Sequence, residues 1–112
     1  MNEQPPKVSE PQTMKQDFTL EIQADNNFSI LNRIVNVLNR RRVRIKKLIA
    51  FESEADFRKG IAILLLYTTP DLMEKVKHQV EKLIEVEYAN YFEGSERYFK
   101  LSEAANKQLT VD

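Results

Sequence analysis

The residues best suited to chemistry stand at a predicted helix start, where residues 25–29 read Asp-Asn-Asn-Phe-Ser. Short polar side chains accept hydrogen bonds from the N–H groups that the first turn of a helix leaves unpaired. The same N–H groups, at the positive end of the helix dipole, can instead hold a carboxylate. The segment is therefore a helix cap or part of a binding loop, and for Asn26 we favour the cap.

A second candidate group is basic and follows the same helix. Its members are Arg40, Arg41, Arg42, Arg44, Lys46 and Lys47. A helix C-terminus favours cations through its dipole, so a solvated, dipole-matched end is the simplest interpretation. Contact with an acidic patch on a partner protein is the alternative that we retain, and contact with nucleic acid is the less favoured third.

No combination of residues predicts a catalytic centre. Glu52, Glu54 and Asp56 lie in one polar turn, where carboxylates are expected to be solvated rather than paired for acid–base catalysis. His78 is the single histidine in a chain without cysteine, and we expect it at the surface. With two glycines in all, the chain has no glycine-rich phosphate loop. We predict a protein that is not an enzyme and has no cofactor and no metal site.

The elements that position these residues follow from hydrophobic periodicity. Residues 18–24 alternate apolar and polar side chains, which predicts a strand, and apolar residues at steps of three and four across 30–38 predict a helix. Residues 43–51 predict a second strand with a bulge near 46–47, and its lysines are typical of a sheet edge.

The second half of the chain repeats this pattern. Residues 60–67 are almost uniformly apolar, which is typical of a central strand. Thr69 as cap and Pro70 in the first turn begin a second helix with an apolar stripe between residues 72 and 84, and residues 86–92 predict a last strand.

This order of elements predicts an α+β, ferredoxin-like βαββαβ fold, with a four-stranded antiparallel sheet and two helices on one face. Strands one and three are expected at the centre. We divide the chain into a disordered leader (1–16), a folded domain (17–93) and a C-terminal tail (94–112). Within the tail, Tyr98, Leu101 and Ala105 have a helical spacing that is too weak to predict a helix.

Composition agrees with one small domain, since the chain has 112 residues of which 42% are hydrophobic. Its formal net charge is zero, so no global field favours nucleic acid or a membrane as a partner. The absence of cysteine and of a signal peptide leads us to expect a cytoplasmic protein. The longest apolar run, residues 61–67, is too short to span a membrane.

Three segments resemble one protein family. Residues 26–35, Asn-Asn-Phe-Ser-Ile-Leu-Asn-Arg-Ile-Val, resemble the Asn-x-Pro-Gly-(Val/Ala)-Leu-x-Arg-(Val/Ile) opening of ACT domains. Residues 41–48 are similar to the Arg-Gly-Tyr-Asn-Ile-Glu-Ser-Leu segment of acetolactate synthase small subunits, and residues 80–86 resemble their Gln-Leu-x-Lys-Leu-(Ile/Val)-Asp-Val helix. The resemblance covers residues 18–92.

The resemblance implies a non-catalytic regulatory subunit that forms a homodimer through its second strand. Such a subunit binds and activates the thiamine-diphosphate-dependent catalytic subunit of acetolactate synthase, in branched-chain amino acid biosynthesis, and some relay inhibition by valine. The implied effector-binding loop consists of Asn26, Phe28, Ser29, Ile30 and Leu31. The implied cross-dimer effector contact consists of Arg44 and Ile45. Our candidates for contact with the catalytic subunit are Arg40, Arg41, Lys46 and Lys47, with Leu64 and Leu66 on the sheet face expected to be open.

Three departures from the family pattern bear on the effector. Phe28 and Ser29 replace the Pro-Gly pair, so a Cβ stands where glycine lets a carboxylate approach the backbone. Arg44 replaces the asparagine that reaches across the dimer, and a guanidinium there would favour an acidic effector. Arg42 replaces the glycine after the first helix and is expected to need a left-handed backbone. We therefore expect valine to bind weakly or not at all.

Two alternatives remain. One is a stand-alone amino-acid sensor of the ACT type. The other is an RNA-binding module, because residues 59–66 echo the Lys-Gly-Phe-Gly-Phe-Val-x-Phe strand of the RNA-recognition motif. In that motif aromatic side chains stack on bases, whereas here isoleucine and leucine occupy their positions. We therefore expect neither nucleic acid nor a membrane as a partner.

Overall fold

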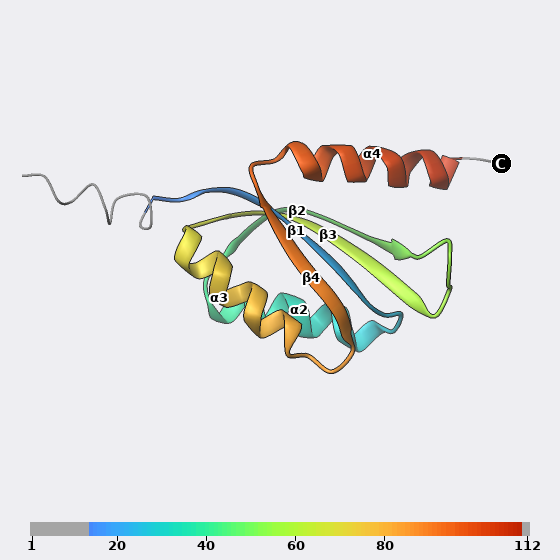
Figure 1. Cartoon of the computed structure of the whole chain (residues 1–112), viewed down its shortest axis with the longest axis horizontal. Helices are drawn as coiled ribbons and strands as arrows, with labels where there is room; N and C mark the ends of the chain where they lie inside the picture. The colour runs from blue at the N-terminus through green and yellow to red at the C-terminus, as the bar shows by residue number, and fades with distance from the viewer. Residues whose placement is uncertain (1–13, 111–112) are drawn as a thin grey trace, which may run out of the picture.

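The computed structural model describes residues 14–110, without the side chains of Phe28 and residues 107–110. Its elements are β1 (Gln16–Asp25), α2 (Phe28–Arg40), β2 (Arg44–Glu52), β3 (Lys59–Thr68), α3 (Pro70–Glu81), β4 (Val86–Glu93) and α4 (Glu96–Thr110). The predicted βαββαβ order is confirmed, and α4 follows it (Figure 1). Most of the predicted leader, residues 1–13, lies outside the described residues, and Gln16 already belongs to β1.

The four strands form one antiparallel sheet in the order β2-β3-β1-β4. Strands β3 and β1 are central and β2 is an edge, as predicted. The register between β2 and β3 shifts between Ile45 and Lys47, which confirms the predicted bulge. This bulge puts Arg44, Lys46 and Lys47 on one sheet face, because the two residues of a bulge share one partner.

Helices α2 and α3 cover one face of the sheet, and the main core lies between these layers (Figure 1). Thr69 caps α3 by accepting the N–H of Leu72 at 3.3 Å, and Pro70 opens the helix, as predicted. The core contains the helix residues Ile34, Leu38, Met73, Val76 and Val80 and the strand residues Phe18, Leu20, Ile22, Leu64 and Leu66. Burial of this apolar surface is the main source of stability in the fold.

Leu64 and Leu66 correct one prediction. Both are fully buried, at 0% exposure, under α2 and α3, and cannot contact a partner on an open face. Residues of the other parity, Ile63 and Leu65, lie on the second face of the sheet. The prediction was wrong because β3 is apolar at every position from Ile61 to Tyr67, so its periodicity does not tell which face the helices cover.

Helix α4 covers part of this second face, in the segment predicted as a tail (Figure 1). Tyr98 and Ala105 of α4 are buried, and Tyr98 packs with Ile63 and Leu65. The Thr19 hydroxyl fixes the start of the helix, since it donates to Gly94 O at 2.9 Å and accepts the Tyr98 N–H at 3.2 Å. Helices therefore pack against both faces of the sheet, and α4 covers the second face only in part.

Arg42 follows the end of α2 and has the left-handed conformation predicted for it, with φ of 57°. Its N–H donates to Asn39 O, and the N–H of Val43 donates to Leu38 O, each at 3.0 Å, which closes the helix end. Glycine adopts this backbone without the steric cost that a Cβ brings. We expect Arg42→Gly to raise the free energy of unfolding by about 1 kcal/mol, measured by chemical denaturation.

The matched control is Arg40→Gly, two residues earlier in the helical last turn. There glycine relieves no strain and is expected to lower the free energy of unfolding by about 1 kcal/mol. A loss of stability in Arg42→Gly as large as in Arg40→Gly would contradict the proposed strain.

Candidate functional site

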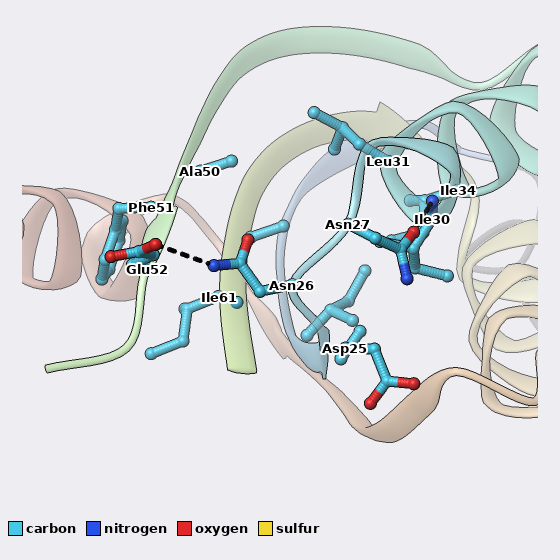
Figure 2. A pocket seen from close by; sticks show the side chains of 14 residues that line it. Asp25, Asn26, Asn27, Ile30, Leu31, Ile34, Ala50, Phe51, Glu52 and Ile61 are labelled. Carbon is cyan, nitrogen blue, oxygen red and sulfur yellow. Dashed lines mark hydrogen bonds between the residues drawn. The ribbon is translucent and has the colours of Figure 1, made fainter. Parts of the chain in front are cut away.

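A cavity of about 430 Å³ lies where the β1–α2 loop (residues 26–27) meets the strands β2 and β3 (Figure 2). Its apolar wall comes from four elements and includes Ile22, Ala24, Ile30, Leu31, Ile34, Ala50, Ile61 and Ala62. Its polar rim consists of Asp25, Asn26, Asn27 and Glu52. A mainly apolar hollow with a few polar groups at one end is the usual form of a small-ligand site.

The helix start beside this cavity is capped by Asn27, and not by Asn26 as predicted. Asn27 Oδ1 accepts the N–H of Ile30 at 3.1 Å and the hydroxyl of Ser29 at 2.8 Å. The cap shifts by one residue because both asparagines have a suitable side chain, and only the backbone decides which one faces the helix.

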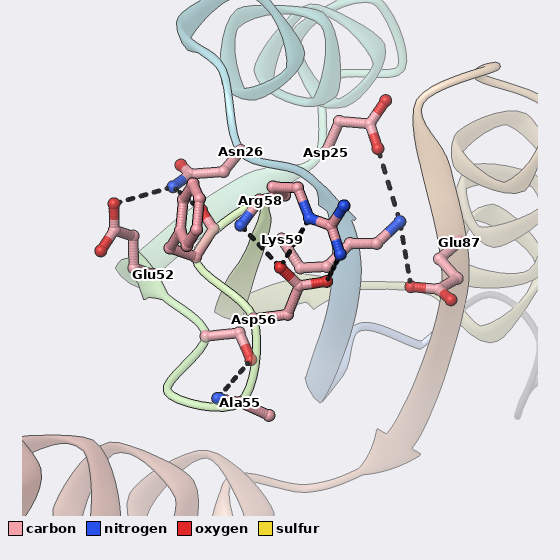
Figure 3. Close-up of polar contacts among 10 residues, drawn as sticks. Asp25, Asn26, Glu52, Ala55, Asp56, Arg58, Lys59 and Glu87 are labelled. Carbon is pink, nitrogen blue, oxygen red and sulfur yellow. Dashed lines mark hydrogen bonds and ion pairs between the residues drawn. The ribbon is translucent and has the colours of Figure 1, made fainter.

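Asn26 instead ties the β1–α2 loop to the β2–β3 loop (residues 53–58). Its Nδ2 donates to Phe57 O at 2.9 Å and to Glu52 Oε2 at 3.1 Å, and its backbone N–H donates to Arg58 O at 2.9 Å (Figure 3). The Asn26 and Glu52 side chains point toward each other at the cavity rim (Figure 2). The hydrogen bonds of Asn26 therefore join the two loops that border the cavity.

The charges at the rim are mainly negative. Asp25 and Glu52 are carboxylates, and no lining residue of the cavity is basic. Lys59 lies nearby, with its Nζ 3.6 Å from both Asp25 Oδ1 and Glu87 Oε1 (Figure 3). A ligand carboxylate would therefore depend on the N–H groups of the α2 start rather than on a basic side chain.

The polar turn next to the cavity is partly ordered by its own side chains. Asp56 accepts hydrogen bonds from the backbone N–H and the Nε of Arg58, both at 3.0 Å (Figure 3). These bonds hold the pKa of Asp56 below its ordinary value. Glu52, Glu54 and Asp56 do not form the buried acid–base pair that catalysis would need.

Of the predicted effector loop, Asn26, Ile30 and Leu31 line the cavity and Ser29 does not. The Phe28 side chain lies outside the described residues. The predicted cross-dimer residues lie elsewhere: Ile45 packs against the main core, and Arg44 lies over the Tyr67 ring with its Cζ 5.8 Å from the centroid. Within one chain, neither residue lines this cavity, so their cross-dimer contact stays a prediction.

The basic candidates divide into engaged and exposed side chains. Arg41 Nε donates to Gln79 Oε1 at 3.0 Å, and Lys46 Nζ pairs with Asp17 Oδ1 at 3.0 Å. The side chains of Arg40 and Lys47 are exposed and have no hydrogen bond or ion pair within the described residues. Arg40 and Lys47 are therefore the more available of the four partner-binding candidates.

Sequence reasoning missed the small residues of the site. Ala50, Gly60 and Ala62 line the cavity, and a Cβ built on Gly60 would lie 3.5 Å from Asn26 Oδ1. Their small size leaves the space that larger side chains would fill. No spacing in the sequence marks three small residues on two strands as one site.

A separate polar cluster lies on α3 and β4. The Tyr91 hydroxyl donates to Glu74, whose other oxygen lies 3.0 Å from His78 Nε2. The hydrogen bond to Glu74 raises the pKa of Tyr91 from 10.0 to about 12, and the same bond lowers the pKa of Glu74. The His78 side chain is 57% exposed, as predicted for a surface residue.

This shift predicts a pH dependence of stability. The pKa of Tyr91 is raised in the folded state, so its hydrogen bond to Glu74 contributes to the free energy of unfolding. This contribution is fully present below pH 10.0 and is lost as pH rises to about 12. We expect the thermal midpoint of the native chain to fall more steeply across this window than that of Tyr91→Phe. If the thermal midpoints of the native chain and of Tyr91→Phe fell equally across this pH window, the role of Tyr91 would be contradicted.

Across residues 14–110, no group of three or more acidic or histidine side chains is placed to hold a metal ion. No described helix has the length and hydrophobicity that crossing a membrane requires.

Solved structures of other proteins share this fold. The ACT domain of GTP pyrophosphokinase from Chlorobium tepidum matches 70% of this chain and all of its own length, with a TM-score of 0.61 at 11% identity. The acetolactate synthase small subunit from Thermotoga maritima matches 73% of this chain, with a TM-score of 0.63 at 17% identity. The chain has the fold of an ACT domain.

This ACT-like fold also occurs in other classes of protein. The 30S ribosomal protein S6 from Thermotoga maritima matches 81% of this chain, with a TM-score of 0.58 at 10% identity. The match to the acetolactate synthase small subunit covers half of that subunit. No family model and no curated protein matches the chain. At these identities the likeness establishes the fold, and function needs a separate argument.

Proposed function

We propose that the chain is a non-catalytic regulatory subunit that binds and activates the thiamine-diphosphate-dependent catalytic subunit of acetolactate synthase, in the biosynthesis of branched-chain amino acids. One observation carries the proposal. The cavity beside the α2 start is lined by Asn26, Ile30 and Leu31, which are three of the residues that the sequence resemblance assigns to an effector loop. The shared fold and the spacings of residues 26–35, 41–48 and 80–86 support it.

A homodimer through β2 belongs to this proposal. Strand β2 is an edge strand, so one row of its backbone N–H and C=O groups has no partner in the sheet of a single chain. In the middle of the strand the Leu48 side chain is 37% exposed. Pairing with a second copy would satisfy the backbone groups and cover this side chain.

The direct test is recovery of the partner. Tagged chain, expressed in its source organism, is expected to retain the catalytic subunit of acetolactate synthase through purification. Tagged Leu64→Ala, whose core is damaged, serves as the control for nonspecific capture. If purification from cells that make the enzyme recovers no catalytic subunit, the proposal is wrong.

We also propose that valine binds weakly. A valine carboxylate at the α2 start would compete with Asn27 Oδ1, which already accepts the Ile30 N–H. Displacing such a bond costs about 0.5–1.5 kcal/mol net. We expect calorimetric titration with valine to give no micromolar binding, while the double variant Phe28→Pro, Ser29→Gly gains affinity. Micromolar binding by the native chain would contradict this prediction.

The stand-alone amino-acid sensor is the second candidate, because the same cavity would serve it. It differs in needing no catalytic subunit. An amino acid that binds tightly to a chain without a catalytic partner would favour the sensor. The RNA-binding alternative has less support, because Ile61, Ile63 and Leu65 pack in the cluster that includes Tyr98 of α4.

A further inference from the structure

Most hydrogen-bond donors at the rim of the cavity beside the α2 start are already used. Asn26 Nδ2 donates to Phe57 O and to Glu52 Oε2, which uses both of its hydrogens, and the Asn26 backbone N–H is paired as well. The backbone N–H of Asn27 donates to Asp25 O at 3.1 Å. Among the rim side chains, Asn27 Nδ2 is the single donor without a partner within the described residues. The rim therefore has little to offer a ligand that only accepts hydrogen bonds.

The acceptors of the same rim are open, and its charge is negative. Asn26 Oδ1 accepts no hydrogen bond within residues 14–110, and the exposed Glu52 carboxylate has no ion pair there. Asp25 lies 3.6 Å from Lys59 Nζ, which is equally close to Glu87. One ammonium group cannot neutralise two carboxylates, so the rim keeps a net negative charge. A ligand that supplies both hydrogen-bond donors and positive charge complements it.

We propose that this cavity selects a small aliphatic cation, such as a branched alkylamine, and disfavours a ligand whose charged group is a carboxylate. An ammonium group has three donors for the open acceptors of Glu52 and Asn26, whereas a carboxylate has none and is repelled by Asp25 and Glu52. The proposal rests on the proposed function, which takes this cavity as the effector site, and it adds the charge of the ligand.

The apolar wall determines the rest of the ligand. It includes Ile30, Leu31, Ile34, Ala50, Ile61 and Ala62. The cavity volume of about 430 Å³ is within the range of small-ligand sites. A short aliphatic group buries apolar surface against this wall and brings no polar atom there that would stay unpaired. The complementary ligand is therefore apolar at one end and cationic at the other.

Arg44 does not alter this charge within one chain. The sequence favours an acidic effector through Arg44, but the Arg44 side chain lies over the Tyr67 ring and does not line the cavity. Its charge can therefore reach a ligand in the cavity only from a second copy of the chain. An Arg44 contact of that kind is the competing interpretation that the experiment has to separate.

The test uses two ligands of matched shape and opposite charge, isoamylamine and isovalerate. Each is titrated at neutral pH into the isotope-labelled full chain, and binding is followed by the NMR signals of the backbone amides. The signals of Ile30, Leu31 and Ile61 are expected to shift, because these residues line the cavity. The Kd of isoamylamine is expected to be at least about fivefold lower than that of isovalerate, and high salt is expected to reduce the difference.

Three variants separate charge from shape. Glu52→Gln removes the charge and keeps an oxygen that can accept from Asn26 Nδ2, and it is expected to raise the Kd of isoamylamine at least about threefold. The matched control is Glu54→Gln, the same change at a residue that borders the hollow beneath α4 and does not line this cavity. It is expected to leave the Kd unchanged. Ala50→Leu, at an exposed position, fills the cavity and is expected to abolish binding of both ligands.

The outcomes separate this proposal from the proposed function. Equal affinity for the two ligands, or no shift with either at tens of millimolar, overturns the selectivity, and the regulatory role stands if the chain still retains the catalytic subunit. Tighter binding of isovalerate that is lost in Arg44→Met also overturns it and assigns the ligand contact to Arg44 of a second copy. Selective binding of isoamylamine by a chain that retains no catalytic subunit supports the selectivity and contradicts the regulatory role.

Discussion

Leu64→Ala is expected to lower the free energy of unfolding by about 2–5 kcal/mol, measured by chemical denaturation. The Leu64 side chain is fully buried between the sheet and the helices α2 and α3. Truncation removes its apolar contacts and leaves a cavity that the surrounding core fills only in part. The expected loss is a large fraction of the stability of a small domain.

Leu48 gives a matched control, because it lies directly opposite Leu64 in the β2–β3 register and is 37% exposed. Leu48→Ala is expected to lower the free energy of unfolding of the single chain by less than about 1 kcal/mol, because the Leu48 side chain buries less apolar surface on folding. If Leu64→Ala kept native stability and lost only partner binding, the placement of Leu64 in the core would be refuted.

Thr19→Val is expected to lower the free energy of unfolding by about 1–3 kcal/mol, because it leaves buried backbone groups unpaired. The Thr19 side chain is fully buried, and its hydroxyl donates a hydrogen bond to Gly94 O and accepts one from the Tyr98 N–H. Valine keeps the shape of threonine but supplies neither hydrogen bond. The loss is expected to concentrate in α4, so hydrogen exchange there should rise before exchange in the central strands.

Thr19→Ser is the control, since it removes a methyl group and retains the hydroxyl. It is expected to keep slow exchange in α4. Equal exchange in the native chain and in Thr19→Val would mean that the hydroxyl does not anchor the helix.

The elements with clear local signals could be predicted from the sequence. Thr69 and Pro70 mark the start of α3 by their chemistry, and the bulge follows from a change of parity in β2. Arg42 could be assigned to a left-handed backbone because it stands where the resembled segment has glycine. In each of these cases a few neighbouring residues decide the structure.

The elements that depend on distant contacts could not be predicted. Helix α4 has a sparse apolar stripe, and its position depends on the Thr19 hydroxyl, far away in the sequence. Tertiary packing rather than propensity supplies most helix stability, so such a helix leaves a weak signal. The faces of β3 were ambiguous for a related reason, because Leu64 and Leu65 are equally apolar and only the packed helices distinguish them.

The candidate site was predicted in part. The resemblance of residues 26–35 located the α2 start, and Asn26, Ile30 and Leu31 do line the cavity. The hydrogen bonds from Asn26 to Glu52 and Phe57 could not be predicted from the sequence, because these partners lie 26 or more residues further along the chain.

The most direct test of the proposed function is reconstitution of activity from purified components. The catalytic subunit of acetolactate synthase from the source organism is assayed for conversion of pyruvate to acetolactate with increasing amounts of the chain. We predict that the chain alone has no activity and that turnover of the catalytic subunit rises to a saturating level as the chain is added. Turnover that stays unchanged at every ratio, or conversion of pyruvate by the chain alone, would contradict the assignment as a regulatory subunit.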